Sequence, residues 1–247
     1  MQHSIDVFTD YQIHVQKPIH TIARLAWRRN ADPGGKYFEV ALELEHPVFY
    51  LPGQYLNIVL DGQRRSYSIT NLPDTATTQL ILLVERLDGG LASSFLDSAA
   101  IGTPVEVVLP FGRLVPQAEK THRHILVATG SGIASLRPIA EWLYKQDGQL
   151  IALLWGLRHR TNIFWQDVFD TFAADSDKFR YAITLTQPDD DWRGLVGRVT
   201  DHITDIPFDP ESYFYLCGGK AMLDDMRAIL KVRGVSASHI LTEQFHI

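Results

Sequence analysis

The pattern of apolar residues changes halfway along the chain, and this change constrains the fold more than any other feature. From residue 11 to about residue 116 the apolar runs are short and closely spaced, with turn signals such as Asp61-Gly62 and Asp88-Gly89-Gly90 between them. Such spacing is typical of an antiparallel barrel or sandwich. We expect strands at 36–44, 54–60, 79–87 and 103–109, and one short helix at 92–98.

After about residue 122, apolar strands alternate with amphipathic helices. Strands are expected at 124–128, 150–155, 179–186, 212–216 and 239–242, and helices at 136–146, 163–172, 198–203 and 220–232. This alternation predicts a parallel sheet covered by helices on both faces, with its ligand crevice at the carboxyl ends of the strands. The chain of 247 residues is therefore expected to form two domains, an antiparallel β-barrel over residues 1–118 and an α/β domain over residues 119–247.

Charge and cysteine content exclude several classes of function. The net charge of −6 provides no general attraction to nucleic acid. No segment approaches the roughly 18 apolar residues of a membrane span, and the N-terminus carries no signal-peptide pattern, so a cytoplasmic protein is expected. Cys217 is the single cysteine and cannot supply the four thiolates of an iron–sulfur cluster. No metal site is expected, and any electron carrier must be organic or external.

Two glycine turns lead into predicted helices. Thr129-Gly130-Ser131-Gly132-Ile133 follows an apolar strand, and the free N–H groups of the helix start favour an anion such as a pyrophosphate. Ser135 stands where a third glycine of the usual dinucleotide motif would be, so a purely structural turn is the alternative. Gly90-Leu91-Ala92-Ser93 is a similar turn, in which Ser93 either bonds a phosphate oxygen or caps the helix.

The segment Arg65-Ser66-Tyr67-Ser68 brings together an anion donor, a flat ring and a hydroxyl group. In a strand, Arg65 and Tyr67 share one face. Tyr67 could stack on a planar ring while Arg65 meets a phosphate of the same ligand. An exposed strand with a cross-strand aromatic pair is an equally consistent interpretation of this segment alone.

Six motifs in order resemble the ferredoxin–NADP reductase superfamily. They are Arg65-Ser66-Tyr67-Ser68, Gly90-Leu91-Ala92-Ser93, Gly130-Ser131-Gly132-Ile133-Ala134, Trp155-Gly156-Leu157-Arg158, Cys217-Gly218-Gly219 and Glu243-Gln244-Phe245. The resemblance implies a flavin-binding barrel followed by a domain that binds NAD(P)H.

The resemblance also implies roles for individual residues on the flavin side. Arg65 would contact the flavin phosphate, Tyr67 would stack on the isoalloxazine, and Ser68 would hydrogen-bond near the flavin N5 that receives hydride. Gly90, Leu91, Ala92 and Ser93 would hold the phosphate or pyrophosphate of the flavin.

On the nucleotide side, the resemblance implies that the nicotinamide nucleotide lies along the second glycine turn and the strand ends beside it. The implied contacts are Thr129, Gly130, Ser131, Gly132, Ile133, Gly156, Arg158, Cys217 and Gly218. Cys217 would pack against the nicotinamide ring, whereas without the resemblance it is more simply a core residue. Glu243 and Phe245 match the family's terminal acid-x-aromatic motif, in which the aromatic ring covers the flavin.

The chain departs from the family pattern near the nicotinamide. Ser135 replaces a usual proline, and Gly219-Lys220 replaces a common Pro-Pro pair. At the positions of the family's 2′-phosphate readers stand Thr186-Gln187, followed by Asp189-Asp190-Asp191, which favours NADH over NADPH. The aspartates could equally form a solvated loop. The segment Glu85-Arg86-Leu87 favours FAD, with FMN as the alternative.

The function expected from these features is that of an NAD(P)H-dependent flavin oxidoreductase. It transfers hydride from nicotinamide to flavin and passes electrons to a separate acceptor such as an oxygenase, a ferredoxin or free flavin. One alternative is a regulatory subunit that binds flavin and nucleotide with little turnover. Another is a nucleotide-binding module without flavin, in which residues 65–68 are structural.

Overall fold

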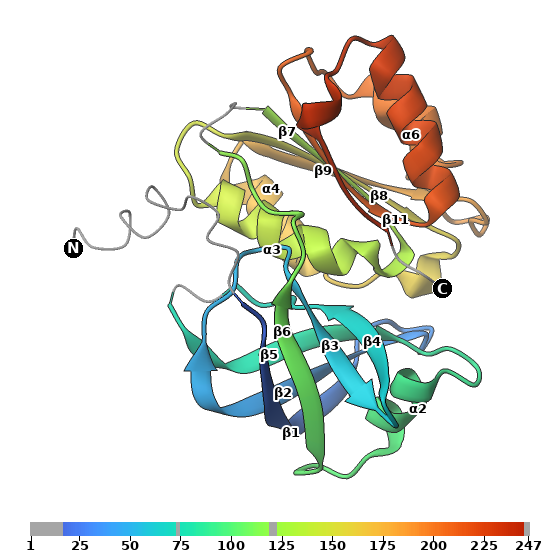
Figure 1. Cartoon of the computed structure of the whole chain (residues 1–247). Helices are drawn as coiled ribbons and strands as arrows, with labels where there is room; N and C mark the ends of the chain where they lie inside the picture. The colour runs from blue at the N-terminus through green and yellow to red at the C-terminus, as the bar shows by residue number, and fades with distance from the viewer. Residues whose placement is uncertain (1–16, 73–74, 119–122, 245–247) are drawn as a thin grey trace.

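The first part of the chain forms an antiparallel sheet that curls into a barrel (Figure 1). The computed structural model describes residues 17–72, 75–118 and 123–244. Its first sheet has the strand order β4-β3-β6-β1-β2-β5. The strands are β1 (Ile19–Asn30), β2 (Tyr37–Val48), β3 (Tyr55–Leu60), β4 (Gln63–Ser68), β5 (Thr77–Glu85) and β6 (Pro104–Phe111).

The two edges of this sheet meet just beyond β4. Ile69 forms a single antiparallel bridge with Leu82 of β5, and the Thr70 amide donates to the Ile81 carbonyl at 2.8 Å. This contact joins the two edges at one point, and the curled sheet encloses an apolar core that includes Leu25, Val40 and Leu56. The expected barrel is confirmed, and the structure adds β1, a strand not predicted from the sequence.

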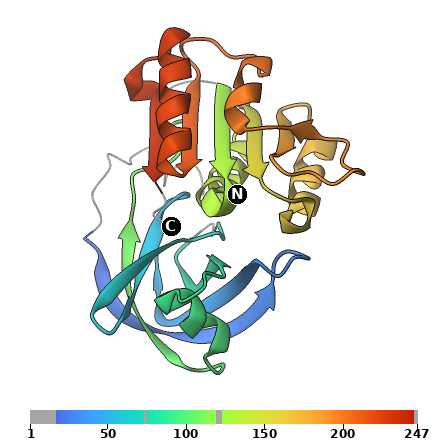
Figure 2. The same ribbon diagram turned by 90° about the vertical axis from the view of Figure 1, so that its right-hand side faces the viewer.

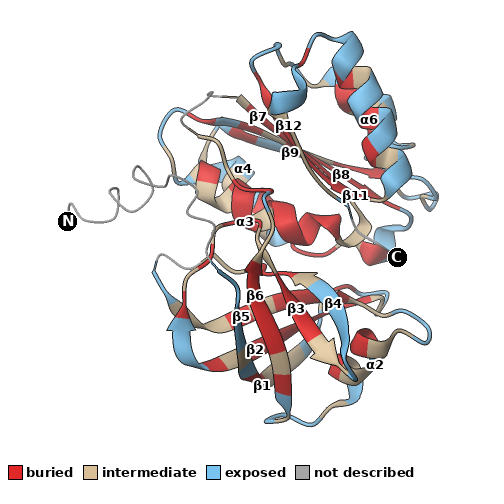
Figure 3. Cartoon of the chain, in the orientation of Figure 1, coloured by how far each residue is buried: buried red, intermediate tan, exposed pale blue. Residues whose placement is uncertain are grey.

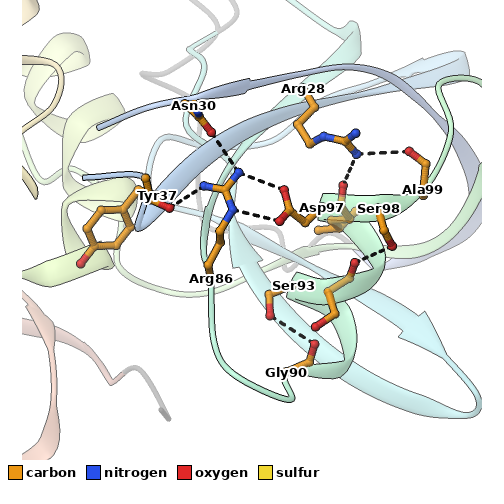
Figure 4. Close-up of polar contacts among 12 residues, drawn as sticks. Arg28, Asn30, Tyr37, Arg86, Gly90, Ser93, Asp97, Ser98 and Ala99 are labelled. Atoms are coloured by element: carbon orange, nitrogen blue, oxygen red, sulfur yellow. Dashed lines mark hydrogen bonds and ion pairs between the residues drawn. The ribbon is translucent and has the colours of Figure 1, made fainter. Parts of the chain in front are cut away.

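A short helix, α2 (Leu91–Ser98), crosses the end of the barrel and is held there by two arginines (Figure 4). Arg86 donates to both carboxylate oxygens of Asp97 at 2.9 Å and to the Gly35 carbonyl at 2.7 Å. Arg28 donates to the Leu96 and Ala99 carbonyls at 2.8 and 3.1 Å, where the helix ends. The Arg28 bonds satisfy carbonyls that the end of a helix leaves unpaired. Together with the Arg86 bonds, they fix α2 and the segment after β5 to the β1–β2 hairpin.

The second part of the chain is the expected parallel sheet, in the order β10-β9-β8-β7-β11-β12. Its strands are β7 (Arg123–Thr129), β8 (Leu150–Leu157), β9 (Phe179–Leu185), β10 (Leu195–Val196), β11 (Tyr213–Gly218) and β12 (Ile240–Gln244). Its helices are α3 (Ile133–Tyr144), α4 (Gln166–Asp175), α5 (Val199–His202) and α6 (Lys220–Val232).

Helices cover both faces of the parallel sheet. One core contains residues of α3 and α4 with Leu126 and Trp155, and the other contains residues of α5 and α6 with Val127 and Leu154. Adjacent residues of one strand thus enter opposite cores, as strand geometry requires. Residues on both faces are mainly buried, whereas α6 exposes its outer side (Figure 3). The carboxyl ends of the strands point toward the barrel (Figure 2).

Direct contacts hold the barrel against the α/β part. Asp32, in the β1–β2 turn, accepts from the Tyr37 amide at 2.7 Å and from the Asn162 side chain at 3.0 Å. Buried Glu39 of β2 accepts from Trp165 Nε1 at 3.1 Å and from Arg29 at 2.7 Å. These carboxylates are paired across the interface, which fixes how β4 and β5 face the parallel sheet.

At the opposite end of the parallel sheet, a buried polar chain fixes the segment that leaves the barrel. Tyr215 Oη lies 3.2 Å from His124 Nδ1 and accepts from the Gln117 amide at 2.9 Å, and His124 Nε2 lies 2.6 Å from Gln149 Oε1. Donation from Nε2 to Gln149 leaves Nδ1 to accept from the tyrosine hydroxyl, so neutral histidine satisfies every one of these contacts.

The substitution Tyr215→Phe is expected to lower the free energy of unfolding by about 1–3 kcal/mol, because it leaves a buried ring nitrogen and a backbone amide without this partner. Chemical denaturation measures the change. Tyr144→Phe is the control: it removes a hydroxyl contact with Asp175 at the surface and should cost less than about 1 kcal/mol. Equal losses in the two variants would contradict the structural role of the Tyr215 hydroxyl.

Candidate active site

A cavity of about 560 Å³ lies where the barrel meets the carboxyl ends of the parallel strands. Both parts of the chain contribute to its walls. The lining residues are Tyr55, Arg64, Arg65, Ser66, Tyr67, Ser68, Leu83, Glu85, Leu87, Ser131, Ala134, Glu243 and Gln244. Five residues predicted from the sequence are therefore brought together here: Arg65, Tyr67, Ser68, Ser131 and Glu243.

Strand β4 forms one wall of the cavity. It is reached through the Asp61-Gly62 turn, where both residues have positive φ, and it places Tyr67 opposite Leu56 of β3. Since this partner is not aromatic, the structure does not contain the cross-strand aromatic pair. Burial raises the pKa of Tyr67 to about 12, so its hydroxyl stays neutral.

Arg65 lies at the exposed part of the same wall. Its guanidinium donates to the Arg64 carbonyl at 2.9 Å and to Gln63 Oε1 at 2.8 Å. Within the described part of the chain it forms no ion pair with a carboxylate. Its charge is thus available to an anionic group entering the cavity.

The second glycine turn forms the facing wall. Gly130 has a positive φ of 54°, which favours glycine, and it accepts through its carbonyl from Trp155 Nε1 at 3.0 Å. A Cβ at Gly132 would lie 2.3 Å from the Cys217 carbonyl oxygen, so only glycine lets the start of α3 approach the end of β11 this closely. The neighbouring Ser131 donates to Glu85 at 3.0 Å, linking this turn to β5.

Four side chains, of which Ser68 and Glu243 also line the cavity, meet in a hydrogen-bonded cluster. Ser68 Oγ lies 2.7 Å from Ser135 Oγ, Ser135 donates to Glu243 Oε1 at 2.8 Å, and the Cys217 thiol donates to Ser135 at 3.5 Å. Burial raises the pKa of Glu243 to about 7, despite hydrogen bonds from Ser135 and Ser68 that lower it. Burial also raises the pKa of Cys217, so the thiol stays protonated.

Several residues expected to contact ligands do not line this cavity. Gly90, Leu91, Ala92 and Ser93 form the start of α2, outside the lining. Gly90 is the N-cap, and buried Ser93 donates to its carbonyl at 3.2 Å, so Ser93 is not the cap that was considered as the alternative (Figure 4). Arg86, in the segment that favoured FAD, is engaged with Asp97.

The remaining nucleotide-side residues lie at the strand ends beyond the cavity lining. Gly156 pairs with Thr129 and Thr184, and a Cβ there would lie 2.8 Å from Val199 Cγ1. A Cβ at Gly218 would lie 2.1 Å from Thr129 Oγ1, and Arg158 is exposed just after β8. Phe245 falls outside the described residues.

Sequence reasoning missed other parts of the site. Tyr55, which stacks on Phe111 at a ring-centroid distance of 5.6 Å, pairs with Ser68 across the β3–β4 hairpin. The register set by the Asp61-Gly62 turn could have identified it. Lys36 Nζ lies 3.0 Å from Glu85 Oε1 beside the cavity, and Glu85 and Leu87, two residues of the segment that favours FAD, are on the cavity wall. Ser135 was noted only as a departure from a motif, although it is the centre of the buried cluster.

Among the described residues, no group of three or more His, Cys, Asp or Glu side chains is arranged to hold a metal ion. No helix within residues 17–72, 75–118 and 123–244 is long and apolar enough to cross a membrane.

Residues 30–115 match the family described as Oxidoreductase FAD-binding domain, and residues 126–228 match Oxidoreductase NAD-binding domain. The chain is 28% identical over 206 residues to ferredoxin–NADP reductase B of Sorangium cellulosum, covering 78% of this chain and 84% of that protein. It is 30% identical over 201 residues to the toluate 1,2-dioxygenase electron transfer component of Pseudomonas putida, covering 79% of this chain but only 59% of the relative.

Among solved structures, the chain is similar to the Amycolatopsis cytochrome P450 reductase, with a TM-score of 0.84 and 27% identity over 92% of this chain and 70% of that one. The two domain matches follow one another in the order of the two sheets. The chain is therefore an oxidoreductase with FAD-binding and NAD-binding domains, and it belongs to the ferredoxin–NADP reductase superfamily.

Proposed function

We propose that this chain takes hydride from NADH onto FAD in the cavity between its two domains and passes the electrons to a separate acceptor. One observation carries the proposal: β4 of the barrel and the second glycine turn of the α/β part line a single cavity. Two ligands held on these walls would face each other. Positioning of two reactants at close range is the main contribution that a protein makes to hydride transfer between cofactors.

The barrel wall provides contacts suited to a flavin. Tyr67 offers a neutral ring for stacking on the isoalloxazine, and the Arg65 guanidinium would bind the flavin phosphate. Ser68 would place its hydroxyl near N5. Gly90, Leu91, Ala92 and Ser93 would approach the phosphates through backbone groups, since the Ser93 hydroxyl already donates to Gly90.

The opposite wall suits a dinucleotide. Thr129, Gly130, Ser131, Gly132 and Ile133 carry the chain from β7 into α3 with little side-chain bulk, as a bound pyrophosphate would require. Gly156, Arg158 and Gly218 would extend this surface along the strand ends. Cys217 would pack beside the nicotinamide as a neutral thiol.

FAD, when bound, accepts a hydride from reduced nicotinamide and releases the electrons onward. The protein's own residues bind, orient and shield the reacting groups. Ser68 is buried, and Glu243, which also lines the cavity, has a pKa of about 7, so both protonation states of this carboxyl are accessible at neutral pH. Phe245 is proposed to cover the flavin face, on the basis of the terminal motif alone.

The nucleotide preference is proposed to be NADH. Asp189, Asp190 and Asp191 follow β9, where the 2′-position of the adenosine is expected, and a 2′-phosphate there would be repelled. Two arginines close by are already engaged: Arg160 lies 3.9 Å from Asp189, and Arg193 donates to the Asp190 carbonyl at 2.9 Å.

The acceptor is proposed to be a separate protein or small molecule. Relatives include the toluate 1,2-dioxygenase electron transfer component and the phenol 2-monooxygenase reductase component, and the chain spans 59% and 60% of their lengths. These names support an oxygenase component as the acceptor class. We assign residues 1–118 to FAD binding, residues 119–247 to NAD(P)H binding, and the chain to the cytoplasm, where NADH is available.

Anaerobic addition of NADH is expected to bleach the absorbance of bound FAD within the first turnover, and NADPH is expected to do so with a lower apparent affinity. Stopped-flow spectroscopy with each nucleotide measures both effects. Unchanged absorbance under conditions in which FAD and NADH are both bound would instead support the regulatory subunit. Failure to take up FAD at all would support the module without flavin.

A further inference from the structure

Ser135 joins the two halves of the cavity through a completely buried hydroxyl group. It lies in the first turn of α3 and contacts Ser68 from β4, Cys217 from β11 and Glu243 from β12, at 2.7, 3.5 and 2.8 Å. A serine hydroxyl has one proton to donate and two lone pairs to accept, so three contacts saturate it. Whether Ser135 donates to one partner or accepts from it therefore depends on which of its other partners donate.

The direction of these hydrogen bonds depends on the proton of Glu243. Ionised Glu243 can only accept, so Ser135 donates to it and Ser68 donates to Ser135. The lone pairs of Ser68 then remain for the cavity. Protonated Glu243 can donate to Ser135, which in turn donates to Ser68, and the Ser68 proton is then directed to the cavity. Cys217 donates to Ser135 in both cases because its thiol stays protonated.

We propose that Ser135 is a positioning residue that couples Glu243 to Ser68, so that Ser68 donates to the cavity when Glu243 is protonated and accepts when Glu243 is ionised. The inference rests on the proposed flavin site, where oxidised N5 accepts a hydrogen bond and reduced N5–H donates one. Ser68 would then donate to oxidised N5 or accept from reduced N5–H, depending on whether Glu243 of β12 is protonated.

Other titratable groups lie around Glu243, but burial and the two serine hydroxyls are the causes of its pKa shift. Tyr55 of β3 and Cys217 of β11 interact electrostatically with Glu243, each with its own pKa raised. Arg64 and Arg65 of β4 and Glu85 of β5 line the same cavity. Ser68 also lies close enough to Glu243 for its hydroxyl to lower the pKa of the carboxyl. Its single proton goes either to Ser135 or to Glu243, so in Ser135→Ala the Ser68 proton still reaches the carboxylate and one of two hydroxyl donors is lost.

The coupling is tested by titrating Glu243 in the full chain without added flavin, using the isotope-edited infrared band of its carboxyl group, which Glu243→Gln assigns by its disappearance. Ser135→Ala is expected to raise the midpoint of Glu243 by about one pH unit, because a hydrogen bond to the carboxylate is lost. Ser135→Thr, which retains a hydroxyl, should restore the midpoint. Ser131→Ala is the control. The Ser131 hydroxyl donates to Glu85 and not to Glu243, so this substitution should leave the Glu243 midpoint unchanged.

The same variants are then measured with FAD and NADH over a range of pH. In Ser135→Ala, the midpoint of the pH dependence of the flavin-reduction rate is expected to rise together with the Glu243 midpoint. In Ser135→Thr, it should return to the value of the parent chain. An unshifted Glu243 midpoint in folded Ser135→Ala would overturn the coupling even if flavin reduction occurs. A shifted midpoint with no flavin reduction in the parent chain would instead refute the proposed function, because the titration does not depend on flavin.

Discussion

Replacing Ser68 by alanine is expected to slow reduction of bound FAD by NADH about 100-fold, the effect of removing one preorganised hydrogen-bond donor from a reaction centre. Ser68 is 3% exposed and lies on the cavity wall, with its hydroxyl held 2.7 Å from Ser135. The variant keeps Arg65 and Tyr67, so FAD should remain bound. Single-turnover stopped-flow measurements at saturating NADH separate the rate of reduction from the affinity for the nucleotide.

A control for this substitution lies in the same domain. The Ser98 hydroxyl donates to the Ser94 carbonyl at 2.8 Å within α2, outside the cavity lining, and Ser98→Ala should leave the reduction rate within about twofold of the parent chain. If Ser68→Ala reduces FAD as fast as Ser98→Ala does, the hydroxyl does not contribute to hydride transfer. The site would then depend on binding contacts alone.

The second large effect is expected at Gly132. A methyl group there would lie 2.3 Å from the Cys217 carbonyl oxygen and 2.7 Å from its carbon, which are backbone atoms that cannot rotate away. Either the start of α3 or the end of β11 must move. Gly132→Ala should therefore lower the free energy of unfolding by about 1–3 kcal/mol. It should also raise the dissociation constant for NADH at least about tenfold, since displaced backbone groups no longer match the nucleotide.

Gly219→Ala is the matched control for Gly132→Ala. Gly219 precedes α6 with a φ of −70°, and a Cβ there would meet nothing within 4 Å. Denaturant unfolding and NADH titration of the two variants give the comparison. Normal NADH affinity in a destabilised Gly132→Ala variant would show that the turn supports only the fold, which is the structural alternative considered for this segment.

The residues at the start of α2 that the sequence predicts to hold the flavin phosphate illustrate a limit of motif-based prediction. Gly90-Leu91-Ala92-Ser93 resembles a phosphate-binding turn, and the structure does place it at a helix N-terminus. The helix is nevertheless turned so that Ser93 is buried against Gly90, and the arginine just before it is committed to Asp97. The orientation of a helix depends on tertiary contacts such as Arg28 with its last carbonyls, and these contacts leave no local signal.

Strand β1 illustrates a related limit. Its apolar residues are interrupted by Arg24, Arg28 and Arg29, so the local pattern does not suggest a buried strand. Only Ala23 and Leu25 enter the core, while Arg28 and Arg29 bond α2 and Glu39. Pairing with β2 and β6 on both sides stabilises the strand, and that pairing joins segments far apart in the chain.

The sequence by itself determined the two kinds of sheet, the position of α6 (Lys220–Val232), and the residues of β4 that line the cavity. Periodicity and turn chemistry act over a few residues, so these features can be recognised locally. Only the tertiary structure decided that Ser135 would join Ser68 to Glu243, residues 67 and 108 positions away in the chain. Such a cluster depends on how the barrel packs against the parallel sheet, and the burial that packing produces also raises the pKa of Glu243.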